Sequence, residues 1–406
     1  MRRVVVTGAG VISPLGDSPA ALHAALCAGK SALKPVELFA TNGLGTVRAG
    51  EIRPFDARAY LGDRNLRPVD RTSRLLLVAA GQALASAGWT PERLDEREVG
   101  LVLGTTFCSV RTIAEFDRRG QQLGPGYASP MDFANSVINA AAGQAAIWHR
   151  LRGVNSTLSG GEASGLMAIA YAADLIAGGR ADALLAGGAE ELCFESFLGC
   201  FRAGRLCGPR PDGAERPVPF DRRRNGFALA EGAALLMLED AESAAARGAN
   251  VLAEVVAHGQ AFAPAPAARA GAVARATGLA LGQAGLAAEE IDCVSAAANG
   301  SPEGDRAEAA GLAAALGPAA AAVPVTAVKG ALGEALGASG GFQAVALLET
   351  FRTGELLGVA GLEATEDGCA LGGLAAASRP VAARRALASA VGWDGHCCAV
   401  VFAGPA

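Results

Sequence analysis

Short apolar runs of strand length alternate with Ala- and Leu-rich segments of helical period along the whole chain. Apolar runs without polar alternation are typical of strands buried on both faces, in a sheet that helices cover. The pattern therefore predicts an α/β protein. The predicted strands are VVVTG (residues 4–8), VGLVLGT (99–105), ADALLAGG (181–188), AALLMLE (233–239), DCVSAAA (292–298) and CAVVFAG (398–404).

Two pairs of similar passages indicate a duplicated fold. Residues 82–102 and 279–294 each contain a helical segment that closes on Ala-Gly, then an acidic turn, then a new strand. In the same order, the tripeptide Ala-Ser-Gly at 163–165 and again at 338–340 leads into a helical segment. Repeats at this scale imply that one supersecondary unit was duplicated.

We expect an N-terminal half over residues 1–255 and a C-terminal half over residues 256–406. The boundary is expected near the stretch AHGQAFAPAPAARAG (257–271), because Pro, Gly and Ala cluster there. This stretch is interpreted as a linker or as a loop over a pocket.

Composition excludes several classes of function. The 406 residues are 51% hydrophobic and carry a net charge of -5, so the chain can bury a large core and offers no general basic surface to nucleic acid. An acidic protein partner would have to bind local arginines such as Arg222, Arg223 and Arg224, but we interpret this run as a solvated surface. Nine scattered cysteines, without a CxxC pair or a histidine at zinc spacing, predict a reducing cytoplasm and no metal.

The start of the chain and its apolar runs give no targeting signal. The opening MRRVVVTGAG has only three apolar residues before Thr7, too few for a signal peptide. No uninterrupted apolar run reaches the ~18 residues that a membrane span needs. We therefore expect a soluble, cytoplasmic protein without a membrane partner.

The same opening tests a dinucleotide-binding interpretation, because a strand leads into Gly8-Ala9-Gly10. Ser13 and Pro14 stand where that motif needs a third glycine and the start of a helix. An oxidoreductase is poorly supported, and no cofactor is expected.

The segment NSTLSGGEASGLMAIAYAADLIAGG (155–179) is the most informative for function. It predicts a tight Gly-rich turn running into a helix, an elbow that holds one side chain in a buried pocket. A nucleophile is expected there, because a helix N-terminus lowers the pKa of a thiol. This chain has Glu162 at that position. A carboxylate is electrostatically favourable near a helix N-terminus, but it cannot exchange a thioester as a thiolate does.

An ordered series of motifs resembles the β-ketoacyl synthases over nearly the whole chain. Besides the elbow, the motifs are VVVTGAGVISPLG, Asn135 and Asn139 before AAAGQAAI, RPVPFDRRRNGFALAEGAALLMLE (216–239), VKGALGEALGASG (328–340) and VGWDGHCCAVVF. The resemblance implies a thiolase-like fold, with duplicated βαβαβαββ halves in a five-layered αβαβα core. It also implies a dimer formed through a strand near the elbow.

Active members of that family carry a nucleophilic cysteine and two histidines, and all three are replaced here. Glu162 stands at the cysteine position, Ala297 at the first histidine position and Glu334 at the second, while Lys329 is retained. The resemblance therefore implies no catalytic residue of the usual kind. We interpret Glu162, Lys329 and Glu334 as a buried polar network that holds a degenerate site together, since a buried charge needs partners. The four histidines, His23, His149, His258 and His396, lie outside these positions and are expected to be structural or exposed.

Catalytically empty relatives of this kind are the chain-length factors, or ketosynthase β subunits, of type II polyketide synthases. The resemblance implies a heterodimer with an active ketosynthase, transient contact with an acyl carrier protein, and steric control of polyketide length without independent catalysis. Glutamate in place of the glutamine that is common in aromatic systems favours a polyene or aryl-polyene product. The expected wall residues of the tunnel and interface are Phe107, Cys108, Val110, Thr112, Met131 and Phe133.

The C-terminal loop also departs from the family pattern, as a gate that has no active site to guard is free to do. Trp393 replaces the family's phenylalanine in this gating loop, and Asp394 replaces a glycine, which stiffens the backbone. Two alternatives stay open. One is a malonyl-carrier decarboxylase, or another residual activity that uses Glu162, and the other is a homodimeric scaffold without a ketosynthase partner.

Overall fold

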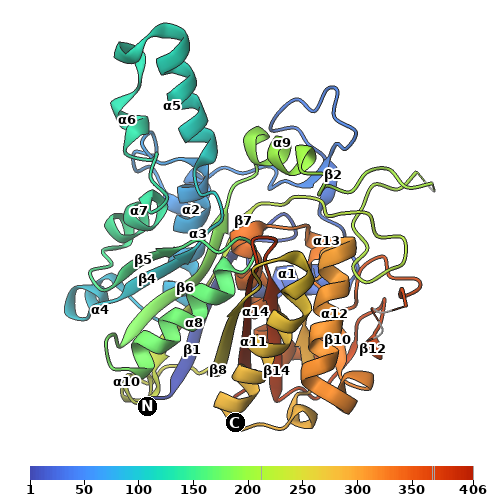
Figure 1. The fold of residues 1–406 in the computed structure, drawn as a ribbon. Helices are drawn as coiled ribbons and strands as arrows, with labels where there is room; N and C mark the ends of the chain where they lie inside the picture. Colours follow the sequence, from blue (N-terminus) through green and yellow to red (C-terminus); the bar gives the residue numbers. More distant parts are fainter. Residues whose placement is uncertain (212, 368, 370, 406) are drawn as a thin grey trace.

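The computed structural model describes residues 1–211, 213–367, 369 and 371–405. Within these ranges the strands join into an eleven-stranded mixed sheet in the order β12-β10-β9-β14-β15-β8-β1-β7-β6-β4-β5 (Figure 1). Two small two-stranded sheets, β2-β3 and β11-β13, lie outside it. The strands are β1 Val4–Ile12, β2 Leu33–Pro35, β3 Arg48–Gly50, β4 Gly100–Gly104, β5 Asn155–Leu158, β6 Ala183–Glu190, β7 Gly232–Asp240, β8 Ala253–Phe262, β9 Cys293–Ser295, β10 Pro324–Thr326, β11 Glu355–Leu356, β12 Gly373–Leu374, β13 Arg379–Pro380, β14 Arg385–Val391 and β15 His396–Ala403.

Helices connect most of these strands and cover the sheet. The α-helices are α1 Pro19–Cys27, α2 Arg58–Leu61, α3 Arg71–Ser86, α4 Pro91–Glu96, α5 Val110–Leu123, α6 Pro130–Phe133, α7 Ala140–His149, α8 Ser164–Ala177, α9 Phe194–Arg202, α10 Ala241–Ala246, α11 Arg269–Ala284, α12 Pro302–Leu316, α13 Lys329–Leu332 and α14 Ser339–Thr353. Short 3-10 turns are η1 Pro125–Tyr127, η2 Pro266–Ala268, η3 Ala288–Glu290, η4 Gly317–Ala321 and η5 Leu336–Ala338.

The sheet consists of two halves with the same strand order. Outward from its centre, one half runs β1, β7, β6, β4, β5 and the other runs β8, β15, β14, β9, β10. The pairing directions also match, because β6 pairs antiparallel with β7 and parallel with β4, as β14 does with β15 and β9. The duplication expected from the repeats is therefore present in the fold.

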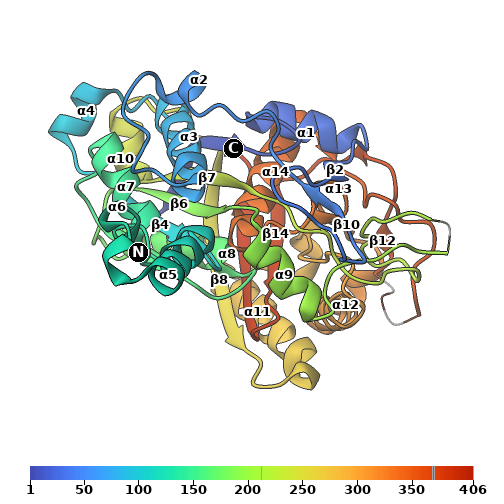
Figure 2. The ribbon, with the colours of Figure 1, turned by 90° about the horizontal axis from the view of Figure 1, so that it is seen from above.

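Helices form three layers around the two halves. α8 and α14 contact each other and strands of both halves, so they lie in the centre, where their apolar side chains form the largest core cluster. α3 and α7 cover the N-terminal half, and α11 and α12 cover the C-terminal half on its outer side (Figures 1 and 2). The result is the expected five-layered αβαβα arrangement of the thiolase-like fold.

Glycines let the two central helices cross at their N-termini. A Cβ on Gly340 would lie 2.4 Å from the main-chain N of Leu166, and a Cβ on Gly165 would lie 2.7 Å from the carbonyl O of Gly337. Both glycines come from the repeated Ala-Ser-Gly tripeptides. The repeat thus marks a backbone contact on the pseudo-twofold axis, where any side chain would separate the helices.

All six predicted strands are present, but the stretch near residue 260 was wrongly interpreted as a linker or loop. Residues 257–262 belong to β8, which pairs with β1 on one side and with β15 on the other. A division between residues 255 and 256 would cut this strand, so we propose that the C-terminal half begins before Ala253.

The crossing predicts a large cost for one added methyl group. We expect Gly340→Ala to lower the free energy of unfolding by about 1–3 kcal/mol, because the new Cβ overlaps the main chain of α8. Gly278→Ala is the matched control, because this exposed glycine in α11 has open space around its Cβ position. We expect Gly278→Ala to raise the free energy of unfolding by about 0.4–1 kcal/mol. Urea unfolding measures both, and equal effects of the two substitutions would contradict the close crossing.

Candidate functional site

The elbow that carries Glu162 lies between β5 and α8, as the sequence predicts. Gly161 adopts a φ of 54°, which favours glycine and turns the chain sharply. Ser164 ties the turn together, because its Oγ accepts from the N–H of Gly160 at 2.9 Å and contacts the carbonyl O of Thr105 at 3.1 Å. The Glu162 side chain is consequently held in the interior, with 4% of its surface exposed.

The carboxylate of Glu162 has one main-chain partner across the site. Its Oε2 accepts a hydrogen bond of 2.9 Å from the N–H of Trp393. Burial and the nearby Glu334 carboxylate together raise the pKa of Glu162 to about 7, against the opposing effects of Lys329 and the Trp393 N–H. The favourable helix N-terminus that we expected from the sequence is therefore outweighed by desolvation.

Lys329 and Glu334 form a fully buried ion pair next to Glu162. Lys329 Nζ lies 2.8 Å from Glu334 Oε2, with the two side chains 1% and 0% exposed. Asn299 Nδ2 donates to the same oxygen at 2.8 Å. The other oxygen, Oε1, accepts from the Leu336 N–H at 2.9 Å and from Ser339 Oγ at 2.5 Å. Four donors thus compensate for the loss of hydration of this carboxylate.

Ala297 presents only a methyl group where the resemblance places the first histidine. Its main-chain N–H donates to Glu308 Oε1 at 2.8 Å, and burial raises the pKa of Glu308 to about 7. Asp305, held by main-chain N–H groups of Asn299 and Gly300, also has its pKa raised by burial, to about 6. The site is therefore lined by acids and lacks a neutral donor at the position of the lost imidazole.

Little space remains between these side chains. The cavity that Glu162, Ala297 and Glu308 line has a volume of about 30 Å³, which is room for about one water molecule. Trp393 lies against it from the turn between β14 and β15, and its ring packs beside Phe107 and Phe227 at centroid distances of 6.3 and 6.4 Å. The cavity is therefore too small to hold an acyl chain.

The sequence-predicted wall residues separate into two groups. Phe107 and Cys108 lie beside the site, and Cys108 is buried among core side chains, with the pKa of its thiol raised by burial to about 12. Val110 and Thr112 are half-buried in the first turn of α5. Met131 and Phe133 of α6 are 51% and 62% exposed, on an arm formed by α5 and α6 that projects from the body (Figure 1).

Sequence analysis missed Glu190, which fixes the loop that carries Phe107. This carboxylate at the end of β6 is 1% exposed, and burial raises its pKa to about 7. Its position directly after a buried strand was the available signal. The donors to it are Thr105 Oγ1 at 3.2 Å and the N–H groups of Thr106 at 2.6 Å, Phe107 at 2.9 Å, Cys108 at 2.9 Å and Gly337 at 3.2 Å.

Matches to known families cover most of the chain. The family described as "Beta-ketoacyl synthase, N-terminal domain" matches residues 1–244, and "Beta-ketoacyl synthase, C-terminal domain" matches residues 248–363. The chain belongs to the β-ketoacyl synthase family.

Individual members of the family are similar over most of their length. The 3-oxoacyl-[acyl-carrier-protein] synthase 2 of Vibrio cholerae is 34% identical over 85% of this chain and 84% of its own. The tetracenomycin polyketide synthase ketoacyl synthase beta subunit of Streptomyces glaucescens is 37% identical over 80% of each chain. The solved structure of the ishigamide ketosynthase/chain length factor superposes over 100% of both chains with a TM-score of 0.92, at 30% identity.

The histidines of this chain do not replace the missing pair. His23 and His149 contact the main-chain carbonyls of Glu355 and Leu77 at 3.1 and 2.9 Å. His258 Nε2 lies 2.9 Å from Asp174. His396 is adjacent to the elbow, but its Nδ1 lies 3.0 Å from Asp394 Oδ2 in the C-terminal turn.

Two of the three arginines that we considered for carrier docking are engaged within the chain. Arg223 pairs with Asp221 at 2.8 Å and with Glu363 at 2.5 Å. Arg224 is buried and pairs with Glu366. The interpretation of this run as a solvated surface is wrong for Arg224, which is buried, while Arg222 is exposed and Arg223 is half-buried.

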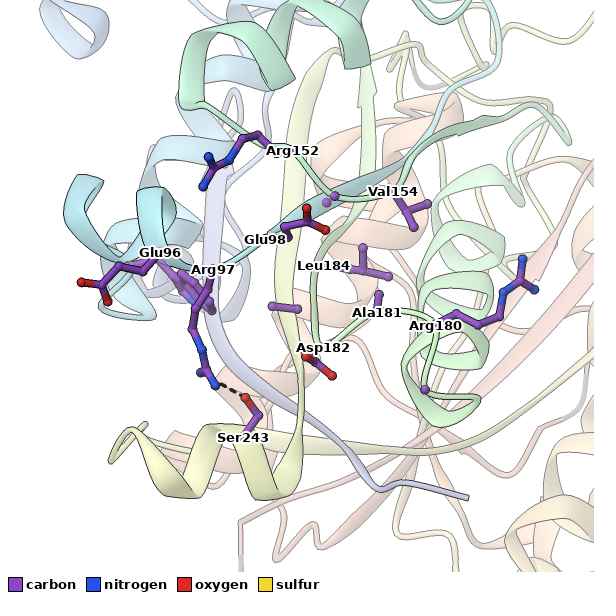
Figure 3. A pocket seen from close by; sticks show the side chains of 15 residues that line it. Glu96, Arg97, Glu98, Arg152, Val154, Arg180, Ala181, Asp182, Leu184 and Ser243 are labelled. Carbon is purple, nitrogen blue, oxygen red and sulfur yellow. Dashed lines mark hydrogen bonds between the residues drawn. The ribbon is translucent and has the colours of Figure 1, made fainter.

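A wider cavity lies far from Glu162. It has a volume of about 450 Å³ and lies at the N-terminal ends of β4 and β6 (Figure 3). The elbow and Glu190 lie at the C-terminal ends of their strands. Two of the cavity's arginines make contacts within the chain, since Arg97 donates to Ser243 Oγ and Arg152 donates to the carbonyls of Leu94 and Asp95.

Two further kinds of feature are absent from the described residues. No helix in these ranges is both long and apolar enough to span a lipid bilayer. In the same part of the chain, no three His, Cys, Asp or Glu side chains converge as a metal-binding group.

The buried ion pair predicts a strong effect of removing one partner. We expect Lys329→Met to lower the free energy of unfolding by about 3–5 kcal/mol, because it leaves the Glu334 charge buried without a cation. The double variant Lys329→Met/Glu334→Gln should recover much of this loss, because it removes both charges. Exposed Lys34→Met is the control for loss of a surface lysine. A loss below about 1 kcal/mol in the single variant would contradict the assigned pairing.

The raised pKa of Glu162 predicts a pH-dependent contribution to stability. The folded state holds this proton more tightly than the unfolded state, whose value is 4.5, so the contribution is complete below pH 4.5 and is lost as pH rises through about 7. Glu162→Gln should therefore gain stability relative to the native chain between about pH 5 and about pH 8, by roughly 2–3 kcal/mol.

Denaturant unfolding across this pH range measures the difference. Glu98→Gln, at an exposed carboxylate, is the matched control and should give a difference that does not change with pH. If the Glu162→Gln difference is equally flat, Glu162 does not bind its proton more tightly in the folded state.

Proposed function

We propose that this chain is a non-catalytic chain-length factor that pairs with an active ketosynthase and shapes the pocket controlling polyketide length. One observation carries the proposal. The three positions that hold a cysteine and two histidines in active members hold Glu162, Ala297 and Glu334, inside a fold that is otherwise intact. No thiolate can accept an acyl chain there, and no imidazole can donate to a developing oxyanion.

An unpaired sheet edge and an apolar surface support a protein partner. Among the residues that the structure describes, β5 is the outermost strand of the N-terminal half and pairs only with β4, so we propose that its other edge pairs with a strand of a partner. Exposed apolar side chains gather in the segment that leads to this strand, and a patch of this kind marks an interface. They are Leu123, Tyr127, Met131, Phe133, Val137, Ile138 and Ile147.

The distribution of the wall residues suggests how the factor acts. Met131 and Phe133 extend from this chain, so we propose that they enter the partner's tunnel and stop the growing polyketide. Phe107, Val110 and Thr112 lie at the base of the same arm and would set its position. Packed interiors tolerate little overlap, so a bulky side chain at the tip ends elongation early. Cys108 is buried in the core and has no direct role in this proposal.

The carrier and the product class follow from the same proposal. The carrier protein would bring malonyl units to the partner's cysteine and contact this chain only transiently. Glu162, in place of the glutamine of aromatic systems, leads us to propose a polyene or aryl-polyene product.

A malonyl-carrier decarboxylase is the competing function. The acids around the cavity argue against it, because Glu162, Asp305 and Glu308 would repel a malonyl carboxylate whenever they are ionised. Release of carbon dioxide from malonyl-carrier by the isolated chain, abolished in Glu162→Ala, would favour this alternative.

Reconstitution with an active ketosynthase that co-purifies with this chain from its host tests the proposal. We expect a one-to-one complex and a product whose length depends on position 133. Phe133→Ala should lengthen the main product by at least one two-carbon unit, and Phe133→Trp should shorten it, as measured by mass spectrometry of carrier-bound chains.

Leu279→Ala provides the control for loss of an exposed apolar side chain. Leu279 is 56% exposed on α11, in the other half of the fold, and its removal should leave product length unchanged. A stable homodimer that binds no ketosynthase would contradict the proposal. A product length that does not change with the residue at position 133, in an intact complex, would also contradict it.

A further inference from the structure

We infer that Glu162 is a latch that holds Trp393 over the degenerate site and keeps this chain's own pocket closed to the arm of a carrier. The closure follows from contacts within the chain. Only the consequence of this closure, namely which subunit receives the carrier-borne chain, rests on the function proposed above.

The main chain of Trp393 is held on both sides. Its N–H donates to Glu162 Oε2 at 2.9 Å, and its carbonyl O accepts from Arg269 Nη2 at 2.6 Å. The Glu162 and Arg269 side chains are both largely buried. One peptide group on each side of the Trp393 Cα is thus anchored to a charged group in the interior, where such bonds are strong.

The indole ring is held separately from the main chain. Phe107 and Phe227 pack beside it, and the Arg205 guanidinium lies over it, with Cζ 4.5 Å from the ring centroid. These contacts are within the range of aromatic and cation–π attraction. Trp393 therefore connects the loop that carries Phe107 with the cavity beside Glu162.

The turn after Trp393 has little freedom to swing away. Gly392 N–H donates to the His396 carbonyl at 2.8 Å, and His396 N–H donates to Asp394 Oδ1 at 3.1 Å. The Asp394 carboxylate also lies against the elbow, because a Cβ on Gly161 would be 3.1 Å from it. The turn and the elbow are packed against each other, so opening the pocket must move both or break the bond to Glu162.

A glutamate suits the latch role better than the family's cysteine. A thiol is a weak acceptor on a short side chain, whereas the carboxylate reaches across the site and accepts the Trp393 N–H strongly. The closed cavity of about 30 Å³ holds about one water molecule, so a pantetheine-sized arm enters only after Trp393 has moved. In the proposed heterodimer, closure of this pocket would direct every carrier-borne chain to the partner's cysteine.

A thiol placed inside the cavity reports its accessibility. Ala297→Cys puts this reporter opposite Glu162, and eight of the nine native cysteines are buried, with Cys27 half-buried. Modification of residue 297 by N-ethylmaleimide is followed over time by peptide mass spectrometry. The rate for the Ala297→Cys chain is compared with the rates for the same chain that also carries Glu162→Gln, Glu162→Ala or Trp393→Ala. Every variant is measured in the oligomeric state in which the unmodified chain purifies.

Glu162→Gln is the matched control, because the amide removes the charge near the reporter thiol but keeps an oxygen that accepts the Trp393 N–H. We expect it to react within about threefold of the Ala297→Cys chain. Glu162→Ala should react at least about tenfold faster than Glu162→Gln, and Trp393→Ala should define the fully open rate. Arg205→Gln leaves the main-chain bonds of Trp393 intact. Its reaction rate should lie between the rates of Glu162→Gln and Trp393→Ala.

Two outcomes would overturn the latch. If Glu162→Ala reacts no faster than Glu162→Gln while Trp393→Ala reacts fast, Trp393 closes the pocket without Glu162. If the Ala297→Cys chain already reacts at the rate of Trp393→Ala, the pocket is open. Neither result depends on a ketosynthase partner or on product length, so failure of the latch is separable from failure of the chain-length function.

Discussion

The ion pair between Lys329 and Glu334 is the interaction on which the rest of the site depends. An unpaired charge in this interior would be costly, and the pair is surrounded by donors that complete the coordination of the carboxylate, from Asn299, Leu336 and Ser339. Those residues belong to the segment that leads into α14 and to the loop after β9. The pair therefore ties the central helix layer to the C-terminal half at the position where active members need a histidine.

The fold was largely predictable because its strongest constraints are local. Buried strands give apolar runs, and the helix crossing at Gly165 and Gly340 requires small residues, which made the repeat visible. β8 was missed because its buried positions are small. Gly259 lies so close to α11 that a Cβ would be 2.1 Å from the Ala276 carbonyl. A strand selected for close helix packing therefore has the composition of a turn.

The site was predictable only at the positions that the family motifs mark. Glu162, Ala297, Lys329 and Glu334 follow from those motifs, but the contacts that define their state do not. The partner of Glu162 is a main-chain N–H 231 positions away, and a main-chain donor leaves no trace in the sequence. The elevated pKa of Glu162 also depends on complete burial, which outweighs the nearby helix N-terminus and becomes visible only when the layers are assembled.

Loss of the nucleophile and closure of the pocket are linked in this chain by one side chain. An active elbow needs a free thiolate and a gate that can open, so a group that bonds the gate would be selected against there. If a partner supplies the thiolate, as proposed above, the same position is free to hold a strong acceptor, and here Glu162 Oε2 accepts from the N–H of Trp393 in the turn. The ring of Trp393 in turn packs on Phe107, whose loop is fixed by Glu190. The degenerate site thus becomes a rigid support for the arm formed by α5 and α6, which is the part of the molecule that a partner would contact.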